Sequence, residues 1–147
     1  MRVLLDTCVI SELRKPDGNE NVKRRILEIP DDNLYISVIS IGEITEGVLC
    51  LADGKNKRAL QSWLRSLERL YGDRILAIDL ETVQIWGELT ADAQKGGVTI
   101  PAMDGLIAAT ARRHGLHVAT RNTGDFDHTG AMLFNPWDDE TRKRKSR

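Results

Sequence analysis

Four acidic residues stand at places where strands end or helices begin. Asp6 directly follows the apolar run 3–5, which predicts a strand buried on both faces. Glu43 and Asp104 fall in the first turns of two predicted helices, and Asp125 follows a further short strand. In an open parallel sheet, the carboxyl ends of strands and the amino ends of the helices that follow them line one edge. We therefore expect Asp6, Glu43 and Asp125 at that edge, with Asp104 beside them if its helix begins there.

Carboxylates that gather in one place repel one another unless a cation neutralises them. Their oxygens are hard ligands, and in the absence of a nearby His/Cys cluster they suit Mg²⁺ or Mn²⁺. Such an ion polarises a phosphate, lowers the pKa of a bound water and neutralises charge on the leaving oxygen. The four acids therefore predict a metal-dependent hydrolysis of phosphodiester bonds.

Each acid also has a structural alternative. Ser40 and Glu43 have the S-x-x-E spacing of a helix capping box. Asp104 in a first helical turn complements the helix dipole, and Asp125 suits a turn. Asp6 is the hardest to explain in this way, because an acid after three apolar residues must be paired, hydrated or metal-bound. The agreement of all four on one sheet edge favours the site.

Other catalytic arrangements are not indicated by the sequence. The three histidines, His114, His117 and His128, lack the spacing of zinc ligands. No Ser–His–Asp arrangement is recognisable, and there is no G-x-x-x-x-G-K-[ST] phosphate loop.

Short apolar runs alternate with helical patterns, which predicts an α/β fold with a largely parallel sheet. The predicted strands span 3–5, 34–39, 75–78, 117–120 and 132–134. The predicted helices span 9–15, 19–29, 40–51, 59–71, 80–95 and 101–114. With 147 residues and an ordinary hydrophobic content of 41%, the chain suits a single domain.

Charge is unevenly distributed along the chain. The 21 Lys and Arg residues nearly balance the 22 Asp and Glu residues. The last six residues, RKRKSR, hold five of the bases, so the preceding part carries 16 bases against 22 acids, a net charge of −6. A body this acidic does not attract nucleic acid at long range and needs local basic patches, the tail or metal ions. We expect residues 139–147 to be a flexible, solvated tail rather than an RNA contact.

The sequence predicts a cytoplasmic protein without membrane contact. No apolar run approaches the roughly 20 residues that span a bilayer, and the N-terminus lacks a secretory signal pattern. Cys8 and Cys50 lie in apolar segments, so we expect both to be reduced residues of the core.

The segments that carry the acids resemble the PIN-domain nucleases, most closely the toxins of the VapC and FitB group. The matching stretches are LLDTCVISELRKP, SVISIGEITEGV, IPAMDGLIAATARRHGLHVATRNTGDF and FNPW. Together they cover nearly the whole chain up to the basic tail. The resemblance implies a three-layer sandwich with a central, mostly parallel sheet, formed by residues 1–138 as one domain.

The resemblance also implies a function and its partners. It implies an endoribonuclease that depends on Mg²⁺ or Mn²⁺ and acts as the toxin of a type II toxin–antitoxin system. The implied partners are RNA, a second copy of the chain, and a small DNA-binding antitoxin of the VapB or FitA kind. The C-terminal segment of that antitoxin is expected to wrap the toxin and cover the acidic site.

Site residues are carried over position by position. Asp6, Glu43 and Asp104 match the three main acids of the family. Its fourth acid lies at Asn122 or three residues later, so Asp125 is expected to take that role, and Cys8 stands where Asn is common. The expected metal ligands are therefore Asp6, Asp104, Asp125 and Glu43. Supporting roles are expected for Thr7, Asn122 and Thr120, and RNA contacts for Arg121 and Arg112.

Two alternatives to a toxin remain open at this point. One is a non-toxin PIN-like nuclease that processes RNA with the same chemistry. The other is a catalytically silent PIN-like binding module, whose acids serve folding or accept the arginines of a partner. A neighbouring reading frame for a small DNA-binding protein would favour the toxin, whereas the absence of metal binding and RNA cleavage would favour the module.

Overall fold

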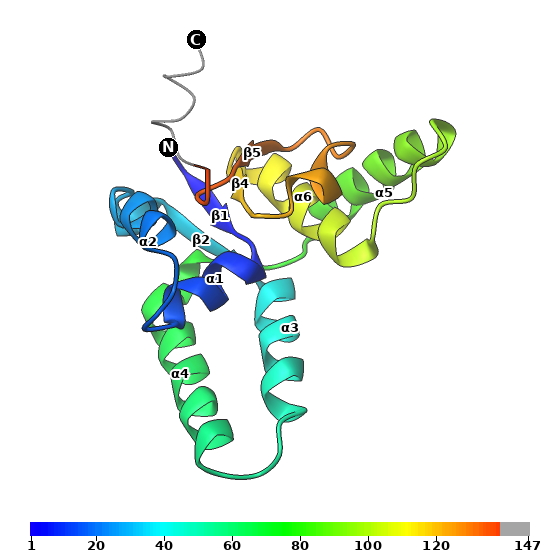
Figure 1. Ribbon diagram of the computed structural model, residues 1–147. Coiled ribbons are helices and arrows are strands. Elements are labelled where there is room, and N and C mark those ends of the chain that lie inside the picture. The colour runs from blue at the N-terminus through cyan, green and yellow to red at the C-terminus, as the bar shows by residue number, and fades with distance from the viewer. Residues whose placement is uncertain (139–147) are drawn as a thin grey trace.

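The structure, a computed structural model, describes residues 1–138 (Figure 1). Within these residues the strands are β1 Val3–Leu5, β2 Leu34–Ser37, β3 Ile75–Leu76, β4 His117–Ala119 and β5 Met132–Phe134. The α-helices are α1 Thr7–Arg14, α2 Glu20–Leu27, α3 Val38–Leu49, α4 Lys55–Tyr71, α5 Leu80–Lys95, α6 Ala102–His114 and α7 Thr123–Phe126. Short 3₁₀ turns, Asp31–Asn33 and Gly72–Arg74, lead into β2 and β3. The predicted basic tail, 139–147, lies outside the described residues.

All five strands run parallel, in the order β3-β2-β1-β4-β5. The chain moves outward from β1 to β2 and β3, then crosses to the other side of β1 through α5 and α6 to form β4. The strand order therefore reverses between β1 and β4, and in such sheets ligands bind at the carboxyl edge of that switch point. The predicted parallel α/β fold is confirmed.

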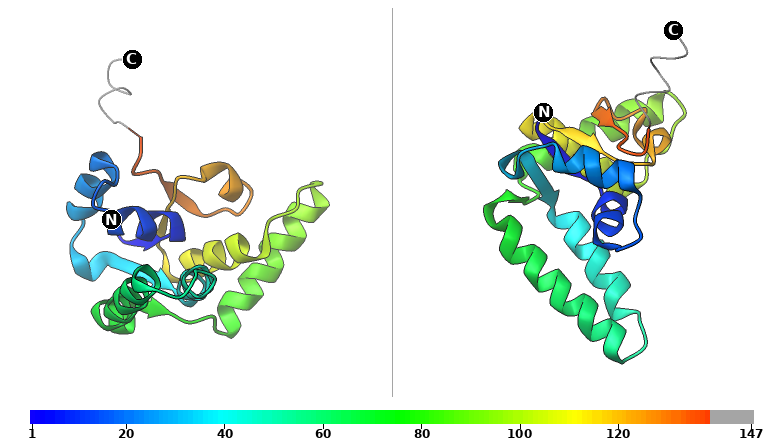
Figure 2. Two further views of the ribbon diagram at one scale, coloured as in Figure 1. Left: turned by 60° about the horizontal axis from the view of Figure 1, so that its bottom comes forward. Right: turned by 60° about the vertical axis from the view of Figure 1, so that its left-hand side comes forward.

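The side chains of the sheet alternate between two hydrophobic cores. Leu5, Ile36 and Ala119 belong to a core that α1, α2, α3 and α4 complete. Leu4 and Val118 belong to a second core with α5, α6 and α7. The two views of Figure 2 show α1 and α2 on one side of the strands and α5 and α6 on the other, while α3 and α4 extend away as an antiparallel pair. This is the predicted three-layer sandwich.

The predicted boundary between the second strand and its helix is wrong by two residues. Ser37, not Ser40, is the N-cap of α3, because its side chain accepts a hydrogen bond of 3.0 Å from the Ile39 backbone N–H. The capping box of Ser40 and Glu43, which was the structural alternative for Glu43, therefore does not form. Glu43 lies in the second turn of α3 rather than in its first, which leaves its carboxylate without a capping role.

Three further differences have local causes. The first helix begins at Thr7 instead of 9 because Asp6 itself caps it. The segment after β4, predicted as a loop, contains the four-residue helix α7, so Asp125 is helical. Helix α4 begins at Lys55 instead of 59. The prediction missed its first turn because that turn is polar and shows no apolar periodicity.

Cysteine placement is partly as predicted. Both Cys8 and Cys50 are free thiols, but Cys50 is exposed at the C-terminal end of α3 and Cys8 is only partly buried. The prediction that both belong to the core is therefore wrong for Cys50. No helix in the described part of the chain is long and apolar enough to cross a bilayer.

Helices α5 and α6 approach closely where Gly105 faces Trp86. A Cβ atom on Gly105 would lie 3.0 Å from Cδ1 and 3.1 Å from Nε1 of the Trp86 indole. Gly105 is buried and directly follows Asp104, so this contact fixes the first turn of α6 against α5.

We expect Gly105→Ala to lower the free energy of unfolding by about 1–3 kcal/mol, because the added methyl group overpacks the indole. Gly87→Ala on α5 is the matched control, since a Cβ at Gly87 meets no atom within 4 Å. That substitution should stabilise the protein by up to about 1 kcal/mol through helix propensity. Urea denaturation measures both. Equal stabilisation by the two changes would show that Trp86 imposes no constraint on α6.

Candidate functional site

Asp6 lies where β1 ends, at the centre of the carboxyl edge. Its backbone N–H donates to Ala119 O at 2.9 Å, and the residue is only 6% exposed. Oδ1 accepts the Thr7 backbone N–H at 2.8 Å, and Oδ2 accepts the Thr120 hydroxyl at 2.8 Å. Neutral donors therefore hold this buried charge in a fixed orientation.

Thr7 connects Asp6 to Glu43. Its hydroxyl donates to Glu43 Oε1 at 2.9 Å and lies 3.0 Å from Ser40 Oγ. Through its backbone N–H and its side chain, this one residue orients carboxylates from two different elements. Ser40, which is fully buried, serves this contact instead of capping the helix.

Thr120 connects Asp6 to the segment that carries Asp125. It is fully buried after β4, and its hydroxyl accepts the backbone N–H of Asn122 at 3.0 Å while donating to Asp6. Asn122 precedes α7 and is exposed, and its side chain forms no capping hydrogen bond. The amide is thus left available at the edge of the site.

The Cys8 thiol takes part in the same network. Its sulfur donates to Asp6 Oδ2 at 3.7 Å and lies 3.7 Å from Thr120 Oγ1. Burial raises the pKa of the thiol, a backbone hydrogen bond with Arg121 lowers it in part, and the charge of Asp6 raises it. A thiol whose pKa is raised stays protonated near neutral pH, so Cys8 supplies a weak donor to the Asp6 carboxylate.

Asp104 reaches the same edge because α6 runs back along β4. Helix α6 ends at Gly115 in the left-handed conformation, and the chain turns directly into β4. The 13 residues of α6 span about 20 Å, enough to carry its first turn to the carboxyl edge. Burial, then the charges of Asp6, Asp125 and Glu43, raise the pKa of Asp104 to about 6. The negative charges of all three other acids therefore disfavour the ionised form of Asp104.

No basic side chain among residues 1–138 forms an ion pair with any of these four acids. Within the same residues, no three His, Cys, Asp or Glu side chains are already drawn together closely enough to hold an ion. Asp6 and Glu43 are restrained by Thr7, whereas the Asp104 and Asp125 carboxylates accept no hydrogen bond from the described residues. A donor set made only of carboxylates fits a hard divalent cation, and Asp104 and Asp125 are the members free to turn toward it.

The two arginines expected to contact RNA have different surroundings. Arg121 is exposed directly after Thr120, with its guanidinium 5.4 Å from the centre of the Trp137 ring. Arg112 lies in the last turns of α6, about 12 Å along the helix from Asp104. Its guanidinium donates to Thr129 O at 3.1 Å and packs on Gly130, so it holds the loop between α7 and β5. The structure brings Arg121, but not Arg112, to the carboxyl edge.

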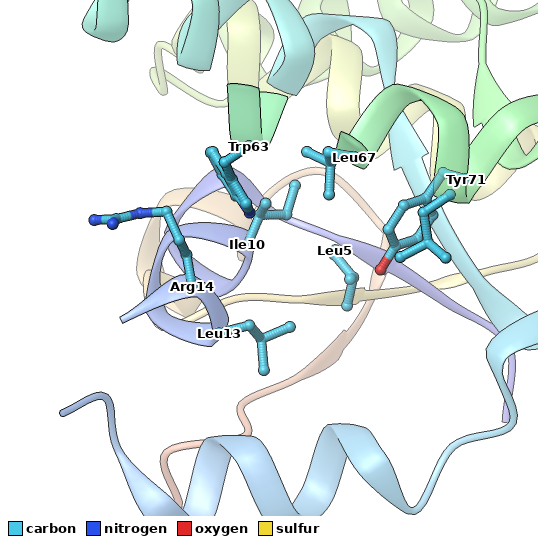
Figure 3. Close-up of a pocket in the computed structure, with 8 residues that line it drawn as sticks. Leu5, Ile10, Leu13, Arg14, Trp63, Leu67 and Tyr71 are labelled. Atoms are coloured by element: carbon cyan, nitrogen blue, oxygen red, sulfur yellow. The ribbon is translucent and has the colours of Figure 1, made fainter. Parts of the chain in front are cut away.

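A groove leads from the acids along α1 and α4. Thr7 and Glu43 line a hollow of about 290 Å³, together with Arg14 and Trp63. Arg14 and Trp63 also line the next hollow, of about 180 Å³, which continues to Leu67 and Tyr71 (Figure 3). The sequence analysis did not predict this groove. Of the apolar side chains of α4, Leu64, Leu67 and Tyr71 are buried in the core, whereas Leu70 is 69% exposed.

Comparison with known proteins agrees with this architecture. The family profile of the PIN domain matches residues 3–132. The chain belongs to the PIN-domain family. Toxin FitB of Neisseria gonorrhoeae is 41% identical over 138 residues, which cover 93% of this chain and 99% of FitB. VapC ribonuclease Y4jK of Sinorhizobium fredii is 38% identical over 138 residues, 92% of this chain and 98% of that protein.

A solved structure extends the comparison to three dimensions. The structure of FitAB bound to an IR36 DNA fragment contains a chain that matches this PIN domain with a TM-score of 0.88 and 39% identity. The match covers 94% of this chain and 97% of that chain. The layers and the parallel sheet thus belong to a fold observed among its relatives.

The raised pKa of Asp104 predicts that the free energy of unfolding of the PIN domain depends on pH. A carboxyl group whose pKa is raised from 3.8 to about 6 on folding binds its proton more tightly in the folded state. Stability therefore falls as pH rises from about 4 to about 6, and the loss persists at higher pH. Replacing the group by a neutral amide removes this loss.

We expect Asp104→Asn in EDTA to raise the Tm at pH 7.5, by about 2–4 °C for each 1 kcal/mol of repulsion relieved. The difference from the parent should shrink as pH is lowered to 4. Asp17→Asn, a change at an exposed acid outside the site, is the control for net charge. Thermal unfolding across pH measures this, and an identical shift for both variants would contradict the coupling of the four acids.

Proposed function

We propose that this PIN domain is an endoribonuclease that requires Mg²⁺ or Mn²⁺ and acts as the toxin of a type II toxin–antitoxin system. The observation that carries the proposal is that Asp6, Asp125 and Glu43 lie near enough to Asp104 for their charges to act on it, without a neutralising base among the described residues. Burial is the largest cause of the raised pKa of Asp104, and the charges of the other three acids raise it further. Relatives named Toxin FitB and VapC ribonuclease support RNA as the substrate and a toxin as the role.

The proposal gives each side chain at the edge a task. Asp6, Asp104 and Asp125 hold the cation, and Glu43 holds it directly or through water. The bound ion supplies a Lewis acid for the phosphate and lowers the pKa of water. The proposed supporting residues act on the acids.

Thr7 and Thr120 keep the Asp6 carboxylate oriented through their hydrogen bonds. Thr7 also holds Glu43 at 2.9 Å. Asn122 has a free side-chain amide that can orient a water molecule, and Arg121 offers a cation to the RNA backbone. None of these groups needs to change its charge during hydrolysis.

The partners follow from the groove and from the relatives. FitAB is described as a complex bound to DNA. By analogy, a small DNA-binding antitoxin of the FitA or VapB kind neutralises this chain by laying its C-terminal segment along α1 and α4. The exposed Leu70 and the half-buried Trp63 line the first hollow and suit apolar side chains of that segment, and the adjoining hollow leads it to Glu43. A homodimer located in the cytoplasm completes the proposal.

One observation favours examining a silent binding module as a second candidate. The described acids do not form a ready-made group of three ligands, so they could accept the arginines of a partner without binding metal. Calorimetry with Mn²⁺ separates the two, because a nuclease must give a saturable binding signal that the module lacks.

Cleavage should depend on Asp6 and on metal. We expect purified protein with Mn²⁺ to cleave RNA, EDTA to abolish cleavage, and Asp6→Asn to lower the rate by about 100-fold or more, because loss of a ligand should cost at least as much as the loss of a residue that only orients one. Asn retains the size of Asp and an oxygen for the Thr7 N–H, so the fold should persist by circular dichroism. Asp17→Asn is the control. Cleavage by the Asp6 variant at the parental rate would refute the assignment of the site.

A toxin and a processing nuclease differ in the cell. We expect expression of this chain to arrest bacterial growth, and co-expression of the small protein encoded beside it to restore growth and to co-purify as a complex. Asp6→Asn should be harmless but still form the complex, because the groove lies outside the substitution. Growth unaffected by the active chain would favour the processing nuclease.

A further inference from the structure

The end of the described chain is fastened at the carboxyl edge of the sheet. Strand β5 runs parallel to β4, so the chain leaves Phe134 at the same edge as Asp6 and Thr120. The four residues that follow, 135–138, are here called the strap. Two side chains of α2 hold it: Arg25 donates to the carbonyls of Asn135 and Asp138, and Asn21 donates to those of Pro136 and Asp138, all between 2.7 and 3.2 Å.

The strap presents Trp137 to Arg121. The Trp137 backbone N–H donates to Asn135 Oδ1 at 2.9 Å, and its half-buried ring packs against the core beside α1 and α2. The guanidinium of Arg121 lies 5.4 Å from the ring centre. When a planar guanidinium lies over an indole, its N–H groups point outward in the plane of the guanidinium. They therefore remain available to a hydrogen-bond acceptor.

Arg121 is not used to neutralise the nearby acids. It follows Thr120, whose hydroxyl bonds Asp6, yet among residues 1–138 it forms no ion pair. Arg121 also has little effect on Glu12. The hydrogen bond from the Asn19 backbone N–H is the main reason that the pKa of Glu12 is lowered, and the charge of Arg121 contributes least. The stack thus keeps an exposed cation at the edge of the site, apart from the carboxylates.

This arrangement fits a single strand of RNA. Without its last six residues the chain has a net charge of −6, so a phosphate backbone needs a local cation to approach the site. Single-stranded RNA is bound by pairing phosphates with Arg and by stacking bases on aromatic or guanidinium planes.

We propose that the Arg121–Trp137 stack is the element that binds the RNA strand beside the carboxylates, and that the strap is its scaffold. This inference rests on the proposed ribonuclease function. It adds Trp137 to the binding surface and gives Asn21 and Arg25 a positioning role. Binding through the stack requires no metal, so it can be measured apart from cleavage.

The test uses the full chain with Asp104→Asn, so that bound RNA stays intact, in EDTA. Fluorescence anisotropy with a short labelled single-stranded RNA gives Kd over a range of salt concentrations. Arg121→Gln should weaken binding by about 5- to 10-fold and reduce the salt slope by about one unit. Arg121→Lys should keep the slope but lose part of the affinity, since Lys lacks the planar stack. Arg65→Gln, at an exposed arginine of α4, is the matched control and should change neither.

A second measurement concerns the ring. RNA binding should alter tryptophan emission, and Trp137→Phe, which keeps an aromatic platform, should remove that change while retaining most of the affinity. If Arg121→Gln and Arg65→Gln bind RNA equally, or if Arg121→Gln weakens only binding of the antitoxin, the inference is wrong. Cleavage by the chain without Asp104→Asn, with Mn²⁺, tests the ribonuclease itself, so failure of the stack and failure of the function are seen separately.

Discussion

The Asp6 carboxylate is the constraint around which this protein is built. It is enclosed because β1 is buried on both faces and ends at the centre of the sheet. An enclosed charge without a counter-charge is costly, and here the donors that hold it are the Thr7 N–H, the Cys8 thiol and the Thr120 hydroxyl. These donors orient the charge without cancelling it. The other three acids then add their fields, and the protein keeps a strongly negative site at some expense in stability.

Parallel topology is what allows distant residues to share this field. Strands β1 and β4 are neighbours although more than a hundred residues separate them, so the residues that follow each strand meet. Helix α6 returns antiparallel to β4 and brings its amino end, with Asp104, to the same place. The close contact of Gly105 with Trp86 secures that end of the helix. The fold thus brings Asp6, which follows β1, and acids of α3, α6 and α7 toward one edge without a single local motif.

The periodicity of apolar residues and the residues that start and end helices predicted the fold and the elements that carry the acids. They could not predict details that depend on tertiary contact. Two serines, Ser37 and Ser40, compete for one cap, and only the position where β2 ends decides between them. Arg112 reads like any exposed arginine of a helix, yet Thr129 on a later loop gives it a structural role. The periodicity of apolar residues could not predict how the strap is held. Its backbone carbonyls accept hydrogen bonds from side chains of α2, which lie more than a hundred residues away in the sequence.

The arginines of this chain show how an acidic site can persist beside basic residues. Arg14 lies over Trp63, Arg25 over Phe134 and Arg121 over Trp137, each within 6 Å of a ring centre. Stacking satisfies the flat face of a guanidinium while leaving its edge to donate hydrogen bonds. A lysine offers no such plane. Trp137 therefore holds the Arg121 guanidinium directly after Thr120, where it forms no ion pair with the four acids among the described residues.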